Sequence, residues 1–178
     1  MTLLVPFDGS DLAEAALVRA AEFGTVLDED VLAVSVVPDG NETYARERGW
    51  IGRNEPFDVF SAVATLHTQA ATLCPSADFR HLRADPDAGP EEIGDRIRAV
   101  AAREDAAMVF VGSDDAGRVV TGVASVGQHV AADESYDVVV VRQRTPAKVA
   151  KLRNTSPLRE PKSDFYFPQR TRRDADAE

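Results

Sequence analysis

Leu3-Leu4-Val5-Pro6-Phe7-Asp8-Gly9-Ser10 opens the chain with a short apolar run that ends in turn-forming residues. An apolar run closed by Asp-Gly-Ser predicts a buried strand that leads directly into a helix. Ser10 is a suitable N-cap for this helix, and Gly24 is the residue at which we expect it to stop. The buried face of the helix is formed by residues at helical spacing: Leu12, Ala16, Ala20 and Phe23.

The rest of the chain to residue 142 repeats this alternation of strand and helix. Apolar or β-branched runs predict strands at 31–37, 79–83, 108–112 and 137–142. Helical spacing predicts three more helices, whose buried faces contain Phe57, Phe60, Val63, Leu66, Ala70 and Leu73, then Ile93, Ile97, Val100 and Ala101, then Val123, Val126 and Val130. We expect the long polar stretch 38–54 to be disordered. The alternation predicts an α/β fold with a five-stranded, open, doubly wound parallel sheet flanked by helices, as in Rossmann-like proteins.

The composition narrows the classes of function. With 178 residues the chain is about the size of one domain, and no apolar stretch is long enough to cross a bilayer. A net charge of −10 and a pI near 4.8 argue against binding to nucleic acid or to an anionic membrane. The single cysteine, Cys74, and the absence of a secretory leader before Asp8 predict a cytoplasmic protein. The chain is acidic, and arginine almost replaces lysine among its basic residues. This composition also suits a cytosol of high salt concentration, which we state as a hypothesis.

Two segments resemble the signature regions of the universal stress protein family, within the adenine nucleotide alpha-hydrolase-like superfamily. They are Val5-Pro6-Phe7-Asp8-Gly9-Ser10 and Val109-Phe110-Val111-Gly112-Ser113, and the resemblance covers roughly residues 1–143. It implies that Asp8 contacts a ribose and Val36 an adenine. It also implies that the strand ending at Gly112 leads into a Gly-x-x-Gly, nine-residue spacer, Gly-Ser/Thr pattern around the phosphates of ATP.

The phosphate loop departs from the family pattern. Gly112 matches the first glycine, but Asp115 stands at the second, and the final pair reads Ala124-Ser125 after a loop one residue shorter. Asp114 and Asp115 would place negative charge near the phosphates, and at a few ångströms such repulsion costs about 1 kcal/mol or more. We therefore expect ATP or ADP, with magnesium, to bind weakly.

The candidate nucleotide-binding residues come from both segments, from the predicted strand 31–37, and from the loop and helix start that follow the second segment: Pro6, Asp8, Ser10, Val36, Gly112, Ser113, Gly117, Arg118, Ser125 and Val126. Gly117 gives the loop freedom, Arg118 can neutralise a phosphate, and the helix near Ser125 offers N–H donors. Each residue also has a purely structural interpretation, since Asp8-Gly9-Ser10 is an ordinary turn and N-cap.

No catalytic or metal-binding residue is predicted. His67, His81 and His129 lie on different predicted elements without metal-ligand spacing, and the serines lack a Gly-x-Ser-x-Gly elbow. Cys74, just before Pro75, is expected to be a packed thiol. Tyr44 and Trp50 either cover a ligand or anchor their long loop, and we favour the anchor.

Three functions remain open. The first is a non-enzymatic stress-response module in which ATP binding is weak or lost, and the second an ATP- or ADP-binding protein with slow hydrolysis. The third is a dimeric scaffold that acts through a C-terminal tail. We expect a homodimer through an apolar edge strand formed by Val138, Val139, Val140 and Val141.

The tail differs in composition from the rest of the chain. We expect residues 1–143 to form the universal stress protein domain, and residues 144–178 to form a basic, Pro-rich extension that is largely disordered or docked on the domain. Phe165-Tyr166-Phe167 is a candidate anchor, either on this domain or on a protein partner.

Overall fold

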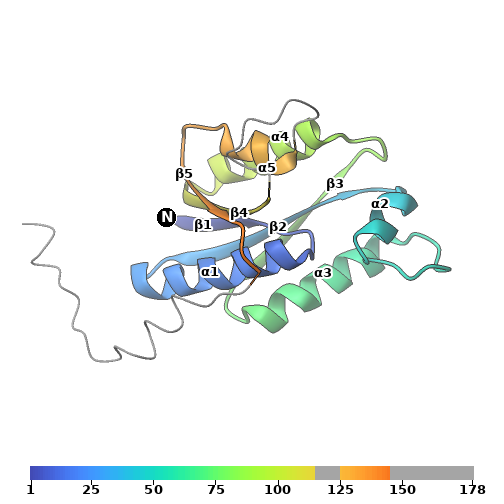
Figure 1. The fold of residues 1–178 in the computed structure, drawn as a ribbon, viewed down its shortest axis with the longest axis horizontal. Coiled ribbons are helices and arrows are strands. Elements are labelled where there is room, and N and C mark those ends of the chain that lie inside the picture. Colours follow the sequence, from blue (N-terminus) through green and yellow to red (C-terminus); the bar gives the residue numbers. More distant parts are fainter. Residues whose placement is uncertain (115–124, 145–178) are drawn as a thin grey trace, which may run out of the picture. The chain divides into compact units, whose positions relative to one another are not determined.

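The computed structural model describes residues 1–114 and 125–144. Within them, five parallel strands form one sheet in the order β3-β2-β1-β4-β5. The strands are β1 (Thr2–Pro6), β2 (Asp30–Pro38), β3 (Asp78–Ala84), β4 (Ala106–Gly112) and β5 (Asp137–Val141). The helices are α1 (Asp11–Leu27), α2 (Glu42–Glu47), α3 (Val59–Leu73), α4 (Pro90–Arg103) and α5 (Val126–Ala131). Figure 1 shows the sheet between two helical layers, with α1 and α3 on one face and α4 and α5 on the other. The predicted α/β fold is confirmed.

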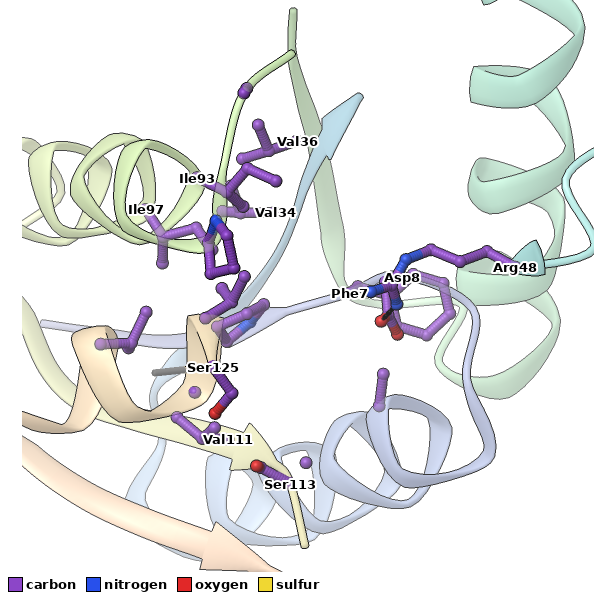
Figure 2. Close-up of a pocket in the computed structure, with 18 of the residues that line it drawn as sticks. Phe7, Asp8, Val34, Val36, Arg48, Ile93, Ile97, Val111, Ser113 and Ser125 are labelled. Carbon is purple, nitrogen blue, oxygen red and sulfur yellow. Dashed lines mark hydrogen bonds and ion pairs between the residues drawn. The ribbon is translucent and has the colours of Figure 1, made fainter. Parts of the chain in front are cut away.

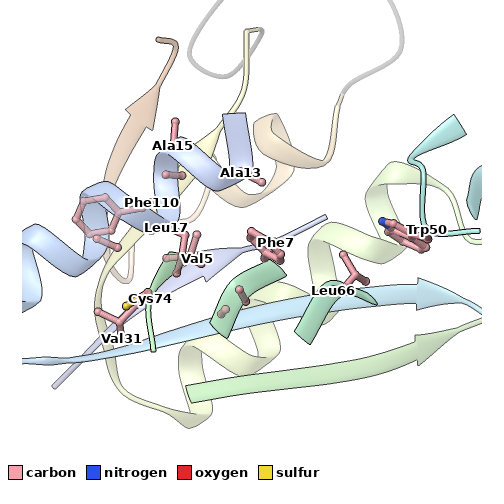
Figure 3. Packing of buried hydrophobic residues seen from close by; sticks show 14 of the residues in the cluster. Val5, Phe7, Ala13, Ala15, Leu17, Val31, Trp50, Leu66, Cys74 and Phe110 are labelled. Atoms are coloured by element: carbon pink, nitrogen blue, oxygen red, sulfur yellow. The ribbon is translucent and has the colours of Figure 1, made fainter. Parts of the chain in front are cut away.

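Strand alternation divides the core between the two faces of the sheet. Leu3 and Val5 of β1 pack with α1 and α3, whereas Leu4, between them, packs with α4 and α5. β2 is buried from Val31 to Pro38, as expected for an inner strand of a sheet covered on both faces. Figure 3 shows the first of these two clusters, in which the Phe110 ring meets Phe23 edge-on with centroids 5.3 Å apart.

The predicted stop of α1 at Gly24 is wrong. The helix begins after the Ser10 N-cap, as predicted, but continues to Leu27 and ends at Asp28, which adopts a left-handed conformation (φ 58°). Gly24 is buried inside the helix, where a Cβ would lie 2.8 Å from the backbone oxygen of Glu29. The glycine therefore allows close contact between the helix and the chain that enters β2.

The predicted disorder of residues 38–54 is also wrong. This segment contains α2, whose N-cap is Asn41, and it buries Trp50 and Ile51 against the core. Phe60, predicted to lie on the buried face of α3, is 73% exposed, and its ring lies under the Arg83 guanidinium. Phe57, also predicted on this face, precedes α3, whereas Leu66 and Ala70 lie buried on the helix as predicted.

Residues 115–124 and 145–178 lie outside the described part of the chain. The predictions for Val123 and for the C-terminal extension therefore stay predictions. The first residue of the extension, Arg144, is described and forms an ion pair with Asp11 over 3.0 Å. In residues 1–114 and 125–144, no helix is both long and apolar enough to cross a membrane.

A polar cluster fixes the turn between α5 and β5. The Asp133 carboxylate accepts hydrogen bonds from the backbone and hydroxyl of Ser135 and from Nε of Arg98. These interactions, led by the Ser135 hydroxyl, lower the pKa of Asp133 to about 2. The neighbouring Tyr136 is buried, and its hydroxyl donates to the backbone oxygen of Val130 over 2.7 Å.

We predict that Asp133 makes stability depend on acid pH. Because its folded-state pKa is lowered, its contribution is complete above pH 4 and is lost as the pH falls toward 2. Between pH 5 and pH 2.5, the free energy of unfolding of Asp133→Asn should therefore fall less than that of the wild type, as measured by urea titration of Trp50 fluorescence. Ser135→Ala should show an intermediate pH dependence. Equal pH dependence in the wild type and Asp133→Asn would contradict the assignment.

Candidate functional site

A cavity of about 310 Å³ opens at the carboxyl ends of the central strands. The strand order changes direction between β1 and β4, and open α/β sheets bind ligands at such a switch point. The cavity is lined by Pro6, Phe7, Asp8, Ala13, Val34, Val36, Tyr44, Arg48, Ala88, Pro90, Ile93, Ile97, Val111, Gly112, Ser113, Ser125, Val126, Gly127 and Val130. Figure 2 shows Val36 and Ile93 at one end of this space and Asp8 with Arg48 at the other.

The wall of the cavity that belongs to β2 and α4 is apolar. Val34 and Val36 come from β2, and Ile93 and Ile97 come from the buried stripe of α4. All four side chains are buried and belong to the core cluster beneath α4 and α5. A rigid apolar wall of this kind suits a flat ring better than a charged group.

Asp8 occupies the polar end of the cavity and is held from three directions. Its carboxylate accepts a hydrogen bond from the backbone N–H of Ser10 over 3.0 Å and forms an ion pair with Arg48. Its backbone oxygen accepts a hydrogen bond from Nε1 of Trp50 over 2.8 Å. The carboxylate therefore has a fixed orientation although its side chain is 35% exposed.

The ring of Tyr44 supports the guanidinium of Arg48. The Cζ atom of Arg48 lies 4.5 Å from the centre of that ring, and Tyr44 in turn meets Trp50 edge-on. Burial raises the pKa of Tyr44, while the nearby Arg48 opposes this shift. The segment from Tyr44 to Trp50 thus closes one side of the cavity.

Gly112 is required by packing at the end of β4. A Cβ at this position would lie 2.2 Å from the backbone oxygen of Leu12 and 2.7 Å from the backbone nitrogen of Ala13. The first turn of α1 therefore rests directly on the backbone of β4. This contact brings the turn after β1 and the end of β4 to the same cavity.

The model of the universal stress protein family matches residues 1–142. The chain belongs to the universal stress protein family. Among solved structures, it resembles a universal stress protein in complex with cAMP (TM-score 0.51, 20% identity, 80% of this chain and 97% of that chain). It also resembles universal stress proteins from Lactobacillus plantarum (0.50, 19%, 80% and 97%) and Archaeoglobus fulgidus DSM 4304 (0.54, 19%, 80% and 44%). These similarities show a shared fold. No curated protein matches the chain.

The structure brings together most of the residues that the universal stress protein resemblance predicted. Those that line the cavity are Pro6, Asp8, Val36, Gly112, Ser113, Ser125 and Val126. Ser10 does not line it, because its hydroxyl caps α1 and accepts from the backbone N–H of Ala13. Gly117 and Arg118, with Asp115 and Ala124, lie outside the described residues.

Ser125 begins α5 with a reciprocal cap. Its hydroxyl oxygen accepts from the backbone N–H of Gln128, and the Gln128 side chain accepts from the backbone N–H of Ser125. The cap orients this serine at the cavity edge.

The apolar lining residues Val34, Ile93 and Ile97 were not predicted as site residues, and neither was Arg48. It lies in the segment that was expected to be disordered, where only the clustering of Tyr44, Arg48 and Trp50 gave a signal. The anchoring role favoured for Trp50 is confirmed by its burial and by its hydrogen bond to Asp8.

The other chemically reactive side chains are placed as the sequence predicted. Cys74 is buried in the core, His67 and His81 are exposed, and His129 is half-buried. Within residues 1–114 and 125–144, histidine, cysteine and acidic side chains form no cluster able to hold a metal ion.

We predict that Gly112→Ala strongly destabilises the fold, by about 3 kcal/mol, because the new methyl group collides with backbone atoms that cannot rotate away. The measurement is urea unfolding followed by Trp50 fluorescence. Gly89→Ala is the matched control: a Cβ there meets no atom within 4 Å, so the cost should be below about 1 kcal/mol. A loss below about 0.5 kcal/mol for Gly112→Ala would contradict the packing role.

Proposed function

We propose that this universal stress protein is a non-enzymatic stress-response module whose cavity binds an adenine nucleotide weakly. The observation that carries the proposal is the arrangement of the cavity, with an apolar wall at Val36 opposite an oriented carboxylate at Asp8. An apolar wall suits the adenine ring, and the carboxylate is a hydrogen-bond acceptor for the hydroxyl groups of a ribose.

The size of the cavity and one relative support this class of ligand. A volume of about 310 Å³ is at the lower end of the range for small-molecule sites, which is roughly 300–1,000 Å³. The similar universal stress protein in complex with cAMP holds an adenine nucleotide on the same fold. Ser113 and Ser125 supply hydroxyl groups on the side of β4 and α5.

The charges around the cavity favour weak binding. In the described lining, Arg48 is the single cation and Asp8 the single carboxylate, and they are paired with each other. Asp114 follows Ser113 and is exposed, and the whole chain carries a charge of −10. A polyphosphate therefore meets no excess of positive charge in the described lining, and its several charges are opposed by the charge of the chain.

The same lining supports binding without catalysis. Its described residues include no histidine, glutamate, lysine or cysteine, and Asp8 is committed to Ser10 and Arg48. General acid–base catalysis needs a group with an available proton or lone pair next to the reacting bond. We therefore assign no residue a catalytic role.

We predict a dissociation constant in the tens of micromolar or weaker for ATP and ADP, which corresponds to about 6 kcal/mol of binding energy. Calorimetry with and without magnesium measures this constant. Asp8→Asn should weaken adenosine binding about tenfold, because hydrogen bonds to a charged acceptor contribute about 1.5–3 kcal/mol. Asp30→Asn is the control and should bind like the wild type, because Asp30 is exposed at the start of β2, whereas the cavity lies at the carboxyl ends of the strands. A submicromolar constant for ATP, or an unchanged Asp8→Asn, would contradict the proposal.

We also propose that the protein acts as a homodimer through β5. In the described residues, β5 pairs only with β4, so it is an edge strand. Val138, Val139 and Val140 are half-buried, and an apolar edge strand is open to pairing with a second copy. Dimerisation would cover this edge.

We expect Val140→Asp to produce monomers, because it places a charge at the centre of the proposed contact. Light scattering at micromolar concentration measures the mass, and Trp50 fluorescence checks that the variant is folded. Val26→Asp makes the same change at an α1 valine that is 79% exposed, and it should remain dimeric. A monomeric wild-type protein at this concentration would remove the proposal.

A further inference from the structure

A second hollow adjoins the nucleotide cavity. Its volume is about 410 Å³, and it shares three lining residues with the cavity: Asp8, Arg48 and Gly112. Its other lining residues are Gly9, Ser10, Asp11, Leu12, Glu47 and Arg144, of which Asp11 and Arg144 form an ion pair. The Asp8–Arg48 ion pair therefore stands on the boundary between an apolar chamber and a polar one.

The position of Arg48 at this boundary allows its side chain to change partners. Arg48 follows the last residue of α2, and its backbone N–H is fixed by a hydrogen bond to Tyr44. Its guanidinium carries five N–H donors; one of them reaches the Asp8 carboxylate, and the group also lies against the side chain of Tyr44. The side chain is 31% exposed, and ion pairs this open to water contribute little to stability. Exchange of the Asp8 carboxylate for another anion therefore costs little, and the backbone of Arg48 and its contact with Tyr44 can stay in place.

We propose that Arg48 is a latch that selects phosphorylated nucleosides, an inference that rests on the proposed nucleotide function of the cavity. Without ligand, Arg48 neutralises Asp8. When a nucleotide places its base against Val36 and its ribose at Asp8, its phosphate reaches the boundary, and Arg48 exchanges the carboxylate for the phosphate. A guanidinium matches a phosphate group with two parallel hydrogen bonds, and the exchange leaves Asp8 free to accept from the ribose.

The latch makes opposite predictions for a nucleoside and a nucleotide. Adenosine must share Asp8 with Arg48 and gains nothing from the guanidinium, whereas AMP offers Arg48 a new partner. Wild-type protein should therefore bind AMP about tenfold more tightly than adenosine. In Arg48→Gln this preference should fall to less than about twofold, because the guanidinium that would pair with the phosphate of AMP is removed. Adenosine should bind the variant equally well or up to about fivefold more tightly, because Asp8 is no longer paired.

The experiment is calorimetry of adenosine and AMP with the full chain, as wild type, Arg48→Gln, Arg48→Lys and Arg46→Gln. Arg46 is the matched control: it lies on α2 just before Arg48, pairs with Glu42 over 2.7 Å and lines neither hollow, so its variant should keep the AMP preference. Arg48→Lys keeps the charge and should retain part of the preference. Circular dichroism and the unfolding midpoint establish that each variant is folded.

The results distinguish the latch from a purely structural role of Arg48 and from a failure of the proposed nucleotide function. An AMP preference that survives in Arg48→Gln overturns the latch, as does an equal loss of adenosine and AMP binding, which would mean that Arg48 only shapes the cavity. If wild-type protein binds adenosine and AMP equally, the latch fails while the nucleotide function stands. Absence of binding by both ligands to the wild type and to Arg48→Gln overturns the proposed function itself, and the latch with it.

Discussion

The turn that follows β1 is the constraint on which the fold and the site both depend. The backbone N–H of Phe7 donates to Val34 over 2.8 Å, and the Phe7 oxygen accepts a 2.6 Å hydrogen bond from the buried hydroxyl of Ser35. Trp50 then donates to the backbone oxygen of Asp8. β1 is the central strand, so this turn also sets where α1 begins and how its first turn meets Gly112 on β4. The direction of the Asp8 carboxylate is therefore fixed by contacts that also stabilise the core.

The arrangement of strands and helices was predictable because it follows from the local periodicity of the apolar residues. Each predicted strand is present, and Ser10 begins α1 as predicted. Where the prediction failed, distant contacts decided the outcome. Trp50 is ordered by a hydrogen bond to a residue 42 positions away, and Gly24 is buried by the chain entering β2, neither of which local spacing reveals. Phe60 follows the helical pattern, yet it remains exposed beside Arg83.

The candidate site was only half predictable, for a related reason. Asp8 and Gly112 belong to recognisable motifs at the ends of two strands, and the topology of the sheet brings such ends together. Gly112 shows how one residue can satisfy a motif and a packing requirement at once, since α1 alone demands a glycine there. Arg48 carries no motif, and its place at the site follows from the fold of a polar loop. In this chain the cavity thus combines strand ends that carry family motifs with a loop that carries none.

We propose that the cavity between the ends of β1 and β4 holds the base of a nucleotide. The most direct measurement is a methyl NMR titration of the protein with AMP. We expect saturable shifts of the methyl resonances of Val36, Ile93 and Ile97, which line the apolar wall, while the exposed Val26 on α1 stays unchanged. Saturable binding with unshifted Ile93 and Ile97 methyl groups, and shifts confined to residues outside the cavity, would contradict it.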